Sequence, residues 1–558
     1  MPEQTAVPDS RGQNLFDVDP YAAPMAACYL PEDLYTHLLP HLRRLGELAG
    51  GQMDELAMTA DHQAPTLSVR HRSGADESRV EKHPAYVELE RLVYSEFGLA
   101  ALSHRSGVLG WPKPMPAAAK YALSHLFVQA EFGLCCPVSM TDSLARTLRR
   151  YGDPALVEQV VPQVTSLDFD TLRQGAMFMT EQGAGSDVSA TTTQALLDDD
   201  GTWRLSGDKW FCSNPDAGFA MVLARSEADP GLKGVSLFLL PRDLPDGRHN
   251  SYRILRLKDK LGTRSMASGE IRLEGARAWL VGERGRGFKQ MADMINNSRL
   301  SNGMRAAGLM RRAVSEAMFV ARERQAFGRS LVDMPLMRRQ LAKMMLWTEQ
   351  ARSVMYQTAQ ALAQAEAGQA SPALARIMTP LIKFRACRDA RKVTGDAMEV
   401  RGGCGYIEEW VEPRLMRDAH LGSIWEGTSN IVALDVLRAI RREEALPALR
   451  AHVDALLQAG RPCDPALADS QSQAVDGAFA LAAHAAQEQR DDLARQAASA
   501  LYHALSVAAL RWEARLPALA GRGLLADQVL RHRLLPRNPC QAQENEDALN
   551  QRVLQAQA

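Results

Sequence analysis

The sequence predicts a mostly helical α+β protein in which a small β domain lies between helical regions. Residues 34–48 and 86–102 carry apolar side chains three and four residues apart, which is the pattern of an amphipathic helix. From about residue 174 to 281 the pattern changes to short apolar runs separated by turn residues, as in 234–240. Helical patterns return over residues 288–440. With 558 residues the chain is too long for a single hydrophobic core, so we expect several domains.

Changes of pattern along the chain divide it into four predicted domains. The first domain (1–172) consists of an N-terminal arm and a helical domain, and the arm is expected to be loosely ordered to about residue 30. The others are a β domain (173–283), a helical bundle (284–441) and an extra C-terminal helical domain (442–558). After Arg441 the composition shifts to Ala, Leu, Gln and Arg. Residues 474–516 are predicted to form one long amphipathic helix that ends at Pro517.

Composition and charge exclude several classes of protein. The formal net charge is −1, so the chain as a whole does not attract nucleic acid or an anionic membrane. The polar N-terminus is unlike a signal peptide, and there is no run of eighteen apolar residues. The eight cysteines are scattered, without C-x-x-C pairs or nearby histidine clusters. We therefore expect a cytoplasmic protein with free thiols, no membrane association and no metal.

The segment Ser423–Asn430, SIWEGTSN, carries the pattern of a general base. Glu426 lies between a bulky aromatic residue, Trp425, and a flexible glycine, Gly427. A carboxylate in water is too weak a base to remove a carbon-bound proton, and an apolar wall such as Trp425 raises its basicity. The alternative interpretation of these eight residues is a solvated loop glutamate.

Three further segments have residue types that suit a large planar or anionic ligand. Residues 179–187, MTEQGAGSD, place a glycine-rich turn after an apolar strand, so backbone N–H groups can approach a ligand closely. Residues 209–214, KWFCSN, add aromatic faces beside a hydroxyl, and residues 324–328, RQAFG, add an arginine suited to phosphate. Each segment alone is equally typical of an ordinary turn, strand or helix face.

Residues 282–288, GERGRGF, have the glycine content of a phosphate-binding loop. Their spacing is not G-x-G-x-x-G and no βαβ unit surrounds them. We therefore predict a tight turn into the following helix.

From about residue 123 to 440 the chain resembles the acyl-CoA dehydrogenase flavoproteins. The resemblance rests on six motifs that occur in the same order along the chain as in that family. The motifs are MTEQGAGSD (179–187), GDKWFCSN (207–214), RQAFG (324–328), MEVRGGCGY (398–406), LMRDAH (415–420) and SIWEGTSN (423–430). Within the family, RLKDKLGTRSMAS (256–268), LCCPVSMT (134–141) and the long tail after residue 440 are most similar to the AidB branch, the bacterial alkylation-response proteins.

The resemblance implies that the β domain is a barrel, that the cofactor is non-covalently bound FAD, and that the substrate is an acyl-CoA. It also implies a homotetramer, and an electron-transfer flavoprotein as the electron acceptor. The positions that match the family's flavin contacts are Thr180, Gly185, Ser186, Phe211, Ser213, Arg324, Phe327, Gly402, Gly403, Thr428 and Asn430. Arg324 and Phe327 match residues that reach the FAD of a neighbouring subunit. Asn296, Arg299 and Trp425 match substrate-side positions.

Glu426 matches the family's catalytic base. Some relatives carry the base on the helix after the β domain, and the matching position is Ser298, which cannot serve; Asp293 is on the same helix but out of register. The chain departs from the family at Glu399, where a glutamine is usual and where a carboxylate would repel a diphosphate, so only backbone contact is expected at the following glycines. It departs again at Phe211, where the ring-side residue is usually tryptophan, and at Asn296, where an aspartate is common.

Two classes of function follow from these motifs. The first is an FAD-dependent acyl-CoA dehydrogenase for short or branched acyl chains, slowed by drift of the thioester site. The second is an AidB-like flavoprotein whose C-terminal domain binds DNA and protects it from alkylation. Thirteen arginines face fourteen acidic residues after residue 440, so the tail is not basic overall.

A local basic patch remains a candidate DNA contact. Its members are Arg522, Arg531, Arg533 and Arg537, and the alternative is an arginine-bearing helix face that packs or pairs within the protein. A third hypothesis is a flavin monooxygenase on the same fold. The presence of Glu426 disfavours it, because an oxygen-activating flavin does not need a base that removes an α proton.

Overall fold

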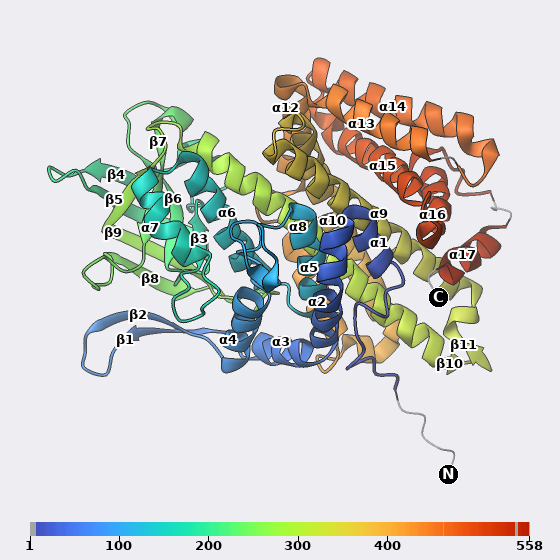
Figure 1. The fold of residues 1–558 in the computed structure, drawn as a ribbon, viewed down its shortest axis with the longest axis horizontal. Coiled ribbons are helices and arrows are strands. Elements are labelled where there is room, and N and C mark those ends of the chain that lie inside the picture. Colours follow the sequence, from blue (N-terminus) through green and yellow to red (C-terminus); the bar gives the residue numbers. More distant parts are fainter. Residues whose placement is uncertain (1–6, 461, 542–544, 557–558) are drawn as a thin grey trace, which may run out of the picture. The chain divides into compact units, whose positions relative to one another are not determined.

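The computed structural model describes residues 7–460, 462–541 and 545–556, and the chain divides into two compact units (Figure 1). The helical unit comprises Met1–Gln52, Ala117–Ala130 and Arg299–Ala558, and the barrel unit comprises Met53–Pro116 and Glu131–Ser298. Each unit is therefore assembled from segments that are far apart in the sequence. The division into four domains stays a prediction.

The strands of the barrel unit form a closed β-barrel, which confirms the predicted fold class. They are β3 (Gly175–Phe178), β4 (Gln194–Leu197), β5 (Trp203–Ser213), β6 (Phe219–Arg225), β7 (Val235–Pro241), β8 (Tyr252–Leu257) and β9 (Ser268–Val281). The strands pair in the order β6, β4, β5, β9, β7, and antiparallel pairing of β7 with β6 closes the ring. Both β6 and β7 are buried along nearly their whole length, as their continuous apolar sequences require.

Helices and a hairpin complete the barrel unit. They are α3 (Gln52–His62), β1 (Thr66–Arg70), β2 (Asp76–Glu81), α4 (Pro84–Arg91), α6 (Cys135–Tyr151) and α7 (Pro154–Val164). The start of α7 follows from its sequence, because Asp153 caps the backbone N–H of Ala155 and Pro154 occupies the first turn. Residues 282–288 form the predicted tight turn, with Gly282 and Gly285 at positive φ.

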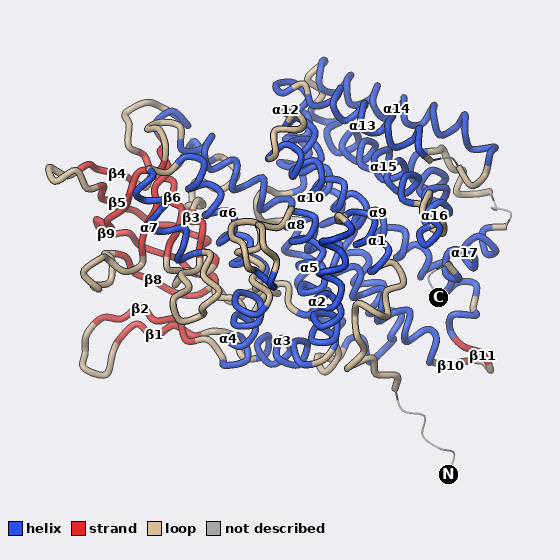
Figure 2. The backbone as a smooth tube through the Cα atoms, in the orientation of Figure 1, coloured by secondary structure: helices blue, strands red, loops and turns tan. Residues whose placement is uncertain are grey.

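The helical unit is built from long helices, coloured blue in Figure 2, whereas the red strands of the barrel belong to the other unit. Its helices are α1 (Ala22–Tyr29), α2 (Glu32–Gly50), α5 (Ala117–Ala130), α9 (Pro335–Glu366), α10 (Pro372–Arg401), α11 (Val411–Gly422), α12 (Ser429–Glu443), α13 (Ala445–Ala459), α14 (Ala468–Gln487), α15 (Ala494–Glu513), α16 (Arg522–Val529) and α17 (Glu546–Gln555). Helix α8 (Gly287–Glu323) starts in the barrel unit, and its residues from Arg299 onward belong to the helical unit, as do the short strands β10 (Gln325–Ala326) and β11 (Arg329–Ser330).

Two predictions about local structure are wrong. The expected loose arm contains α1, where Met25 and Tyr29 are buried, because its apolar side chains cover the helical unit's core. The single long helix predicted over residues 474–516 is instead two helices, α14 and α15. The polar run 488–492 interrupts the amphipathic pattern, and Gln489 takes a left-handed conformation there.

A buried ion network ties the C-terminal region to the rest of the helical unit. The Arg522 side chain is fully buried, and its guanidinium donates to Glu513 in α15 and to Glu349 in α9. It also donates to the Ser353 hydroxyl at 2.7 Å. Glu513 in turn accepts a hydrogen bond from the Tyr29 hydroxyl of α1. The extra C-terminal helices are therefore part of one core with the bundle and α1.

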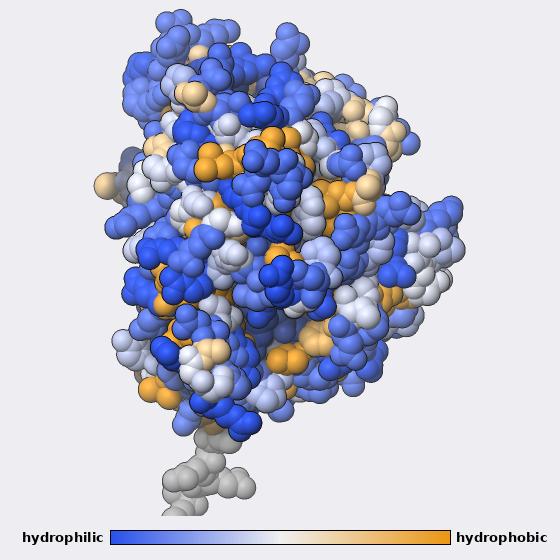
Figure 3. All heavy atoms as spheres, turned by 90° about the vertical axis from the view of Figure 1, so that its left-hand side faces the viewer, coloured by the Kyte–Doolittle hydropathy of each residue, from blue (hydrophilic) through white to orange (hydrophobic). Residues whose placement is uncertain are grey.

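Figure 3 shows a face of the molecule that is mainly hydrophilic, with hydrophobic side chains in separate small areas. Among the described residues, no helix combines the length and the apolarity that crossing a membrane requires.

We predict that Arg522→Ala lowers the free energy of unfolding by about 3–5 kcal/mol, because it removes the cation that pairs with the buried Glu513 carboxylate and one of the cations around Glu349. Urea denaturation followed by circular dichroism measures the change. The control is Arg531→Ala, which removes a partly exposed ion pair with Asp464 and is expected to cost about 1 kcal/mol or less. Equal unfolding midpoints for the two variants would contradict the prediction.

Candidate functional site

The segment predicted to carry a base forms a strained turn between α11 and α12. Glu426 takes a left-handed conformation with φ +55°, which is uncommon for a residue with a side chain, and Gly427 follows at φ +103°. Strained backbone of this kind persists only where surrounding contacts impose it. The Glu426 side chain is half-buried, so the solvated-loop alternative does not describe it.

Helix α8 contacts this turn through two side chains. Arg299 donates from Nε to the Glu426 carbonyl oxygen at 3.0 Å, and Asn302, which is buried, donates to the Glu426 carboxylate. Arg299 is itself held by the Asp435 carboxylate of α12 at 2.8 Å. Arg376 of α10 binds both oxygens of the same carboxylate, at 3.0 and 2.8 Å. The turn is therefore connected to three helices by charged hydrogen bonds.

Helix α10 contacts the turn through Lys383. Its ammonium donates to the Gly427 carbonyl oxygen at 2.6 Å. Burial lowers the pKa of Lys383 to about 8, although Cys387 and Glu426 oppose the shift. Burial also raises the pKa of the neighbouring Cys387 thiol to about 11, so this thiol is protonated at neutral pH.

The environment of Glu426 differs from the apolar wall that the sequence suggested. The Arg305 guanidinium lies over the Trp425 ring, 4.6 Å from its centroid, in a cation–π contact. Arg299 and Lys383 contact the backbone of the same turn. The turn at Glu426 is therefore lined by cations as well as by an aromatic ring. Sequence reasoning missed Lys383, Arg305 and Asn302; the one signal was a lysine inside the apolar run Leu381–Phe384.

In the barrel unit, the glycine-rich turn after β3 is fixed by Glu181. Its carboxylate accepts hydrogen bonds from the backbone N–H groups of Thr192 and Thr193, at 2.7 and 3.1 Å, and from the buried Lys209 ammonium at 2.8 Å. Burial raises the pKa of Glu181, but the Lys209 charge and these hydrogen bonds outweigh it and lower the pKa to about 2. Glu181 is therefore ionised at neutral pH, and its carboxylate holds the backbone of the turn through these hydrogen bonds.

The outer side of this turn is open. Gly183 and Gly185 are exposed, and a Cβ atom at either position would meet no atom within 4 Å. Ser186 is also exposed, and Thr180 accepts a hydrogen bond at its carbonyl oxygen from the Trp210 N–H at 2.8 Å.

On β5, Phe211 is 56% exposed although it is aromatic, and Ser213 is half-buried two residues further on. The Lys258 ammonium lies 3.5 Å from the centroid of the Trp210 ring and 4.8 Å from that of Phe211. The displaced tryptophan is therefore covered by a lysine, and the exposed aromatic face is that of Phe211.

The remaining predicted flavin positions lie in the helical unit and are exposed. Thr428 and Asn430 lie at the N-terminus of α12, where backbone N–H groups favour an anion. Gly402 begins the turn after α10 at φ +77°, a conformation that suits glycine. Arg324 donates to the Arg401 carbonyl oxygen at 3.0 Å, beside Gly402. Phe327 is 95% exposed.

The types of residue found in each unit are suited to binding a flavin dinucleotide. The barrel unit presents an exposed aromatic ring and a turn whose glycines leave its backbone uncovered. The helical unit presents a helix N-terminus, an exposed arginine and a glycine turn. Glu399 is engaged by the Gln340 amide at 3.4 Å, so contact through the backbone at Gly402 and Gly403 stays the expectation.

The alternative base Asp293 is already engaged. Its carboxylate accepts a hydrogen bond from the Tyr151 hydroxyl at 2.6 Å and pairs with Arg150 at 2.8 Å. Ser298 is buried, and Asn296 is half-buried. Asp293 belongs to the barrel unit, whereas Glu426 belongs to the helical unit.

The four tail arginines have partners within the protein. Arg522 is buried in the ion network, so it cannot contact DNA, and the prediction for this residue is wrong. Arg531 pairs with Asp464, and Arg537 lies 3.8 Å from the Glu546 carboxylate. Arg533 lies over the Trp347 ring. The structure thus agrees with the alternative of an arginine-bearing face that packs and pairs.

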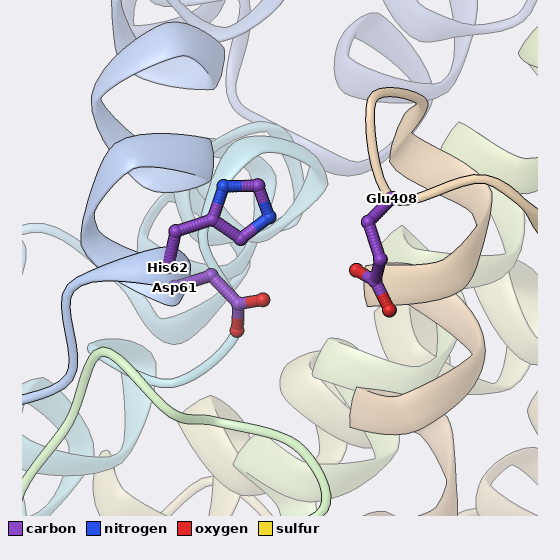
Figure 4. Close-up of side chains that lie close together, drawn as sticks. All are labelled: Asp61, His62 and Glu408. Carbon is purple, nitrogen blue, oxygen red and sulfur yellow. The ribbon is translucent and has the colours of Figure 1, made fainter.

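Figure 4 labels Asp61 and His62, adjacent residues at the C-terminal end of α3 in the barrel unit. Its third residue, Glu408, belongs to the helical unit, where Arg417 binds its carboxylate. Two neighbouring side chains on one helix are too few ligands for a protein metal site.

Comparison with known proteins places this chain in the class of acyl-CoA dehydrogenase folds. The family description "Acyl-CoA dehydrogenase, C-terminal domain" matches residues 285–441, "Acyl-CoA dehydrogenase, middle domain" matches 176–276, and "Adaptive response protein AidB N-terminal domain" matches 5–171. The chain is 33% identical over 465 residues to "Acyl-CoA dehydrogenase family member 11" of Caenorhabditis elegans, covering 81% of this chain and 74% of that protein.

It is also 35% identical over 409 residues to "Putative acyl-CoA dehydrogenase AidB" of Escherichia coli, covering 71% of this chain and 73% of that protein. The solved structure of Caenorhabditis elegans ACDH-11 in complex with C11-CoA matches with a TM-score of 0.89 at 28% identity, over 96% of this chain and 94% of that one. The chain belongs to the acyl-CoA dehydrogenase family, and the predicted likeness to AidB is confirmed.

We predict that Arg324→Ala weakens FAD binding. Loss of a charge-assisted hydrogen bond costs about 1.5–3 kcal/mol, which corresponds to a roughly tenfold to hundredfold higher Kd. FAD retention after gel filtration, followed by absorbance, measures the effect. The control Arg329→Ala removes a neighbouring exposed arginine of β11 and should retain FAD as the unchanged protein does. Equal retention in both variants would exclude a role for Arg324.

Proposed function

We propose that the protein is an FAD-dependent acyl-CoA dehydrogenase that introduces an α,β double bond into a short or branched acyl-CoA. The observation that carries the proposal is the turn at Glu426, where a carboxylate is held in a strained conformation by contacts from α8 and α10. Strain of this kind is typical of functional sites. Family membership and the C11-CoA bound by the ACDH-11 relative support an acyl thioester as the substrate.

In the proposed reaction the Glu426 carboxylate removes the proton from the α carbon, and the β hydrogen leaves as a hydride. FAD supplies the hydride acceptor. The residues that would hold it are Thr180, Gly185, Ser186, Phe211, Ser213, Arg324, Phe327, Gly402, Gly403, Thr428 and Asn430. Fixed orientation of the base is the chain's main contribution to the rate in this proposal.

Departures from the family pattern give a reason for a slow reaction. Phe211 stands where a ring-side tryptophan is usual, and Asn296 stands where an aspartate is common. We therefore propose a real but slow dehydrogenase site.

Three further parts of the proposal concern partners and compartment. We propose a homotetramer in which Arg324 and Phe327 serve a neighbouring subunit's FAD, and both side chains are exposed, as this role requires. An electron-transfer flavoprotein is the proposed electron acceptor, and the cytoplasm is the proposed location. The AidB-like alternative, DNA protection through the tail, is not favoured, because each of the four predicted arginines is engaged within the protein.

We predict that Glu426→Gln lowers the rate of flavin reduction by roughly 10² or more, because the amide keeps the size of the side chain but cannot accept the proton. Anaerobic stopped-flow bleaching with a panel of acyl-CoAs, including C11-CoA, measures the rate. FAD content and the unfolding midpoint should stay unchanged.

The matched control is Asp293→Asn, which removes the alternative carboxylate and should reduce flavin at the normal rate. Undiminished reduction in Glu426→Gln would mean that another group is the base. A salt-dependent DNA titration of the same two variants tests the alternative function. DNA binding unaffected by Glu426→Gln, together with no reduction by any acyl-CoA in the unchanged protein, would favour the AidB-like role.

A further inference from the structure

We propose that Lys383 is a positioning residue for Glu426: it holds the Gly427 carbonyl and thereby fixes the turn that aims the Glu426 carboxylate. The inference rests on the proposed function, because it requires Glu426 to be the base. It assigns a role to a side chain on α10 that none of the motifs contains.

The position of Lys383 is unusual for a lysine. The side chain is 1% exposed and follows Leu381 and Ile382 in a buried part of α10. Lysine is almost never buried without a specific partner. Its ammonium donates a hydrogen bond to the carbonyl oxygen of Gly427, the residue after Glu426, at 2.6 Å. The lysine therefore contacts the turn and not the carboxylate itself.

The backbone geometry explains why this contact bears on the base. The Glu426 φ of +55° and the Gly427 φ of +103° point the peptide between them away from its relaxed direction. Arg299 holds the carbonyl of this peptide, that of Glu426, and Lys383 holds the carbonyl of the next peptide, that of Gly427. Two cations from two helices thus fix the two peptides that follow the Glu426 Cα, and with them the backbone from which its side chain projects.

Lys383 and Arg299 differ in what else holds them. Arg299 is anchored by Asp435 as well as by the turn. The charged and titratable groups that face the Lys383 ammonium are Cys387 on α10, Arg299 and Arg305 on α8, and Glu426 in the turn. With a protonated thiol and two cations around it, the ammonium is oriented mainly by Gly427 and Glu426. Its charge is therefore coupled to the base without contacting it.

The test compares Lys383→Met, which keeps the length and loses the ammonium, with Lys120→Met as a control. Lys120 is a buried lysine of α5 in the same unit, where it lies over the Tyr121 ring. The rate of flavin reduction is measured per bound FAD with the acyl-CoA that bleaches the unchanged protein fastest. Acyl-CoA affinity is measured by equilibrium dialysis in the Glu426→Gln background, where turnover is suppressed.

We expect Lys383→Met to reduce flavin about 10- to 100-fold more slowly, since a small misplacement of a reacting group costs on the order of 10² in rate. The acyl-CoA Kd should change by less than about threefold, and Lys120→Met should be normal in both assays. A normal rate per bound FAD in Lys383→Met would overturn the inference. A parallel loss of affinity would also overturn it, because it would indicate a general collapse of the pocket.

The pH profile gives a readout that a purely structural lysine would not move. Below a pH of about 8 Lys383 carries its proton, and above it the ammonium is lost. The reduction rate of the unchanged protein should therefore fall as the pH rises through about 8, and Lys383→Met should lack this fall. The inference would be contradicted if the reduction rates of the unchanged protein and of Lys383→Met both fell at alkaline pH with the same midpoint. If Lys383→Met does not fold, Lys383→Gln and the profile of the unchanged protein decide in the same way.

Failure of the inference is distinguishable from failure of the proposed function. If Glu426→Gln abolishes reduction while Lys383→Met leaves the rate unchanged, only the role of Lys383 is wrong. If Glu426→Gln reduces flavin normally, the base lies elsewhere and the proposed function fails with it.

Discussion

The hydrogen bonds that hold the Glu426–Gly427 turn are the constraint on which the proposed chemistry depends. The turn is strained, and a strained segment keeps its shape only while its neighbours impose it. Those neighbours are charged groups on long, buried helices, which are among the most rigid parts of a fold. The proposed base therefore lies on a loop that is held by helices, an arrangement that is common at enzyme sites.

The same principle of buried charge explains the C-terminal region. Arg522 binds Glu349 and Glu513 with its whole side chain in the core, and Tyr29 of α1 joins them. Breaking such a group is costly because an unpaired charge would remain in a medium of low polarity. The extra helices are thus fixed to the bundle, and they are not a module on a flexible linker. The role of Arg522 in this tail is to hold the C-terminal helices to the bundle.

Sequence patterns predicted most of the fold because periodicity reports which faces are buried. The β domain, the bundle, the glycine turn at 282–288 and the motif around Glu426 all followed from local pattern or from family order. The break between α14 and α15 did not, because a short polar run inside a helical period looks like an exposed face. Arg522, Lys383 and Arg305 were missed or misread because burial of a cation is decided by partners distant in the sequence.

The Asn302 contact shows how such a partner can shape the reaction. A carboxylate has two oxygens, and the proposed proton transfer needs only one of them. The Asn302 amide donates a hydrogen bond to Oε2 of Glu426 and so restrains the plane of the carboxylate. The amide therefore limits the rotation of the base while Lys383 and Arg299 limit the backbone beneath it. The proposed base is thereby restrained at both its side chain and its backbone.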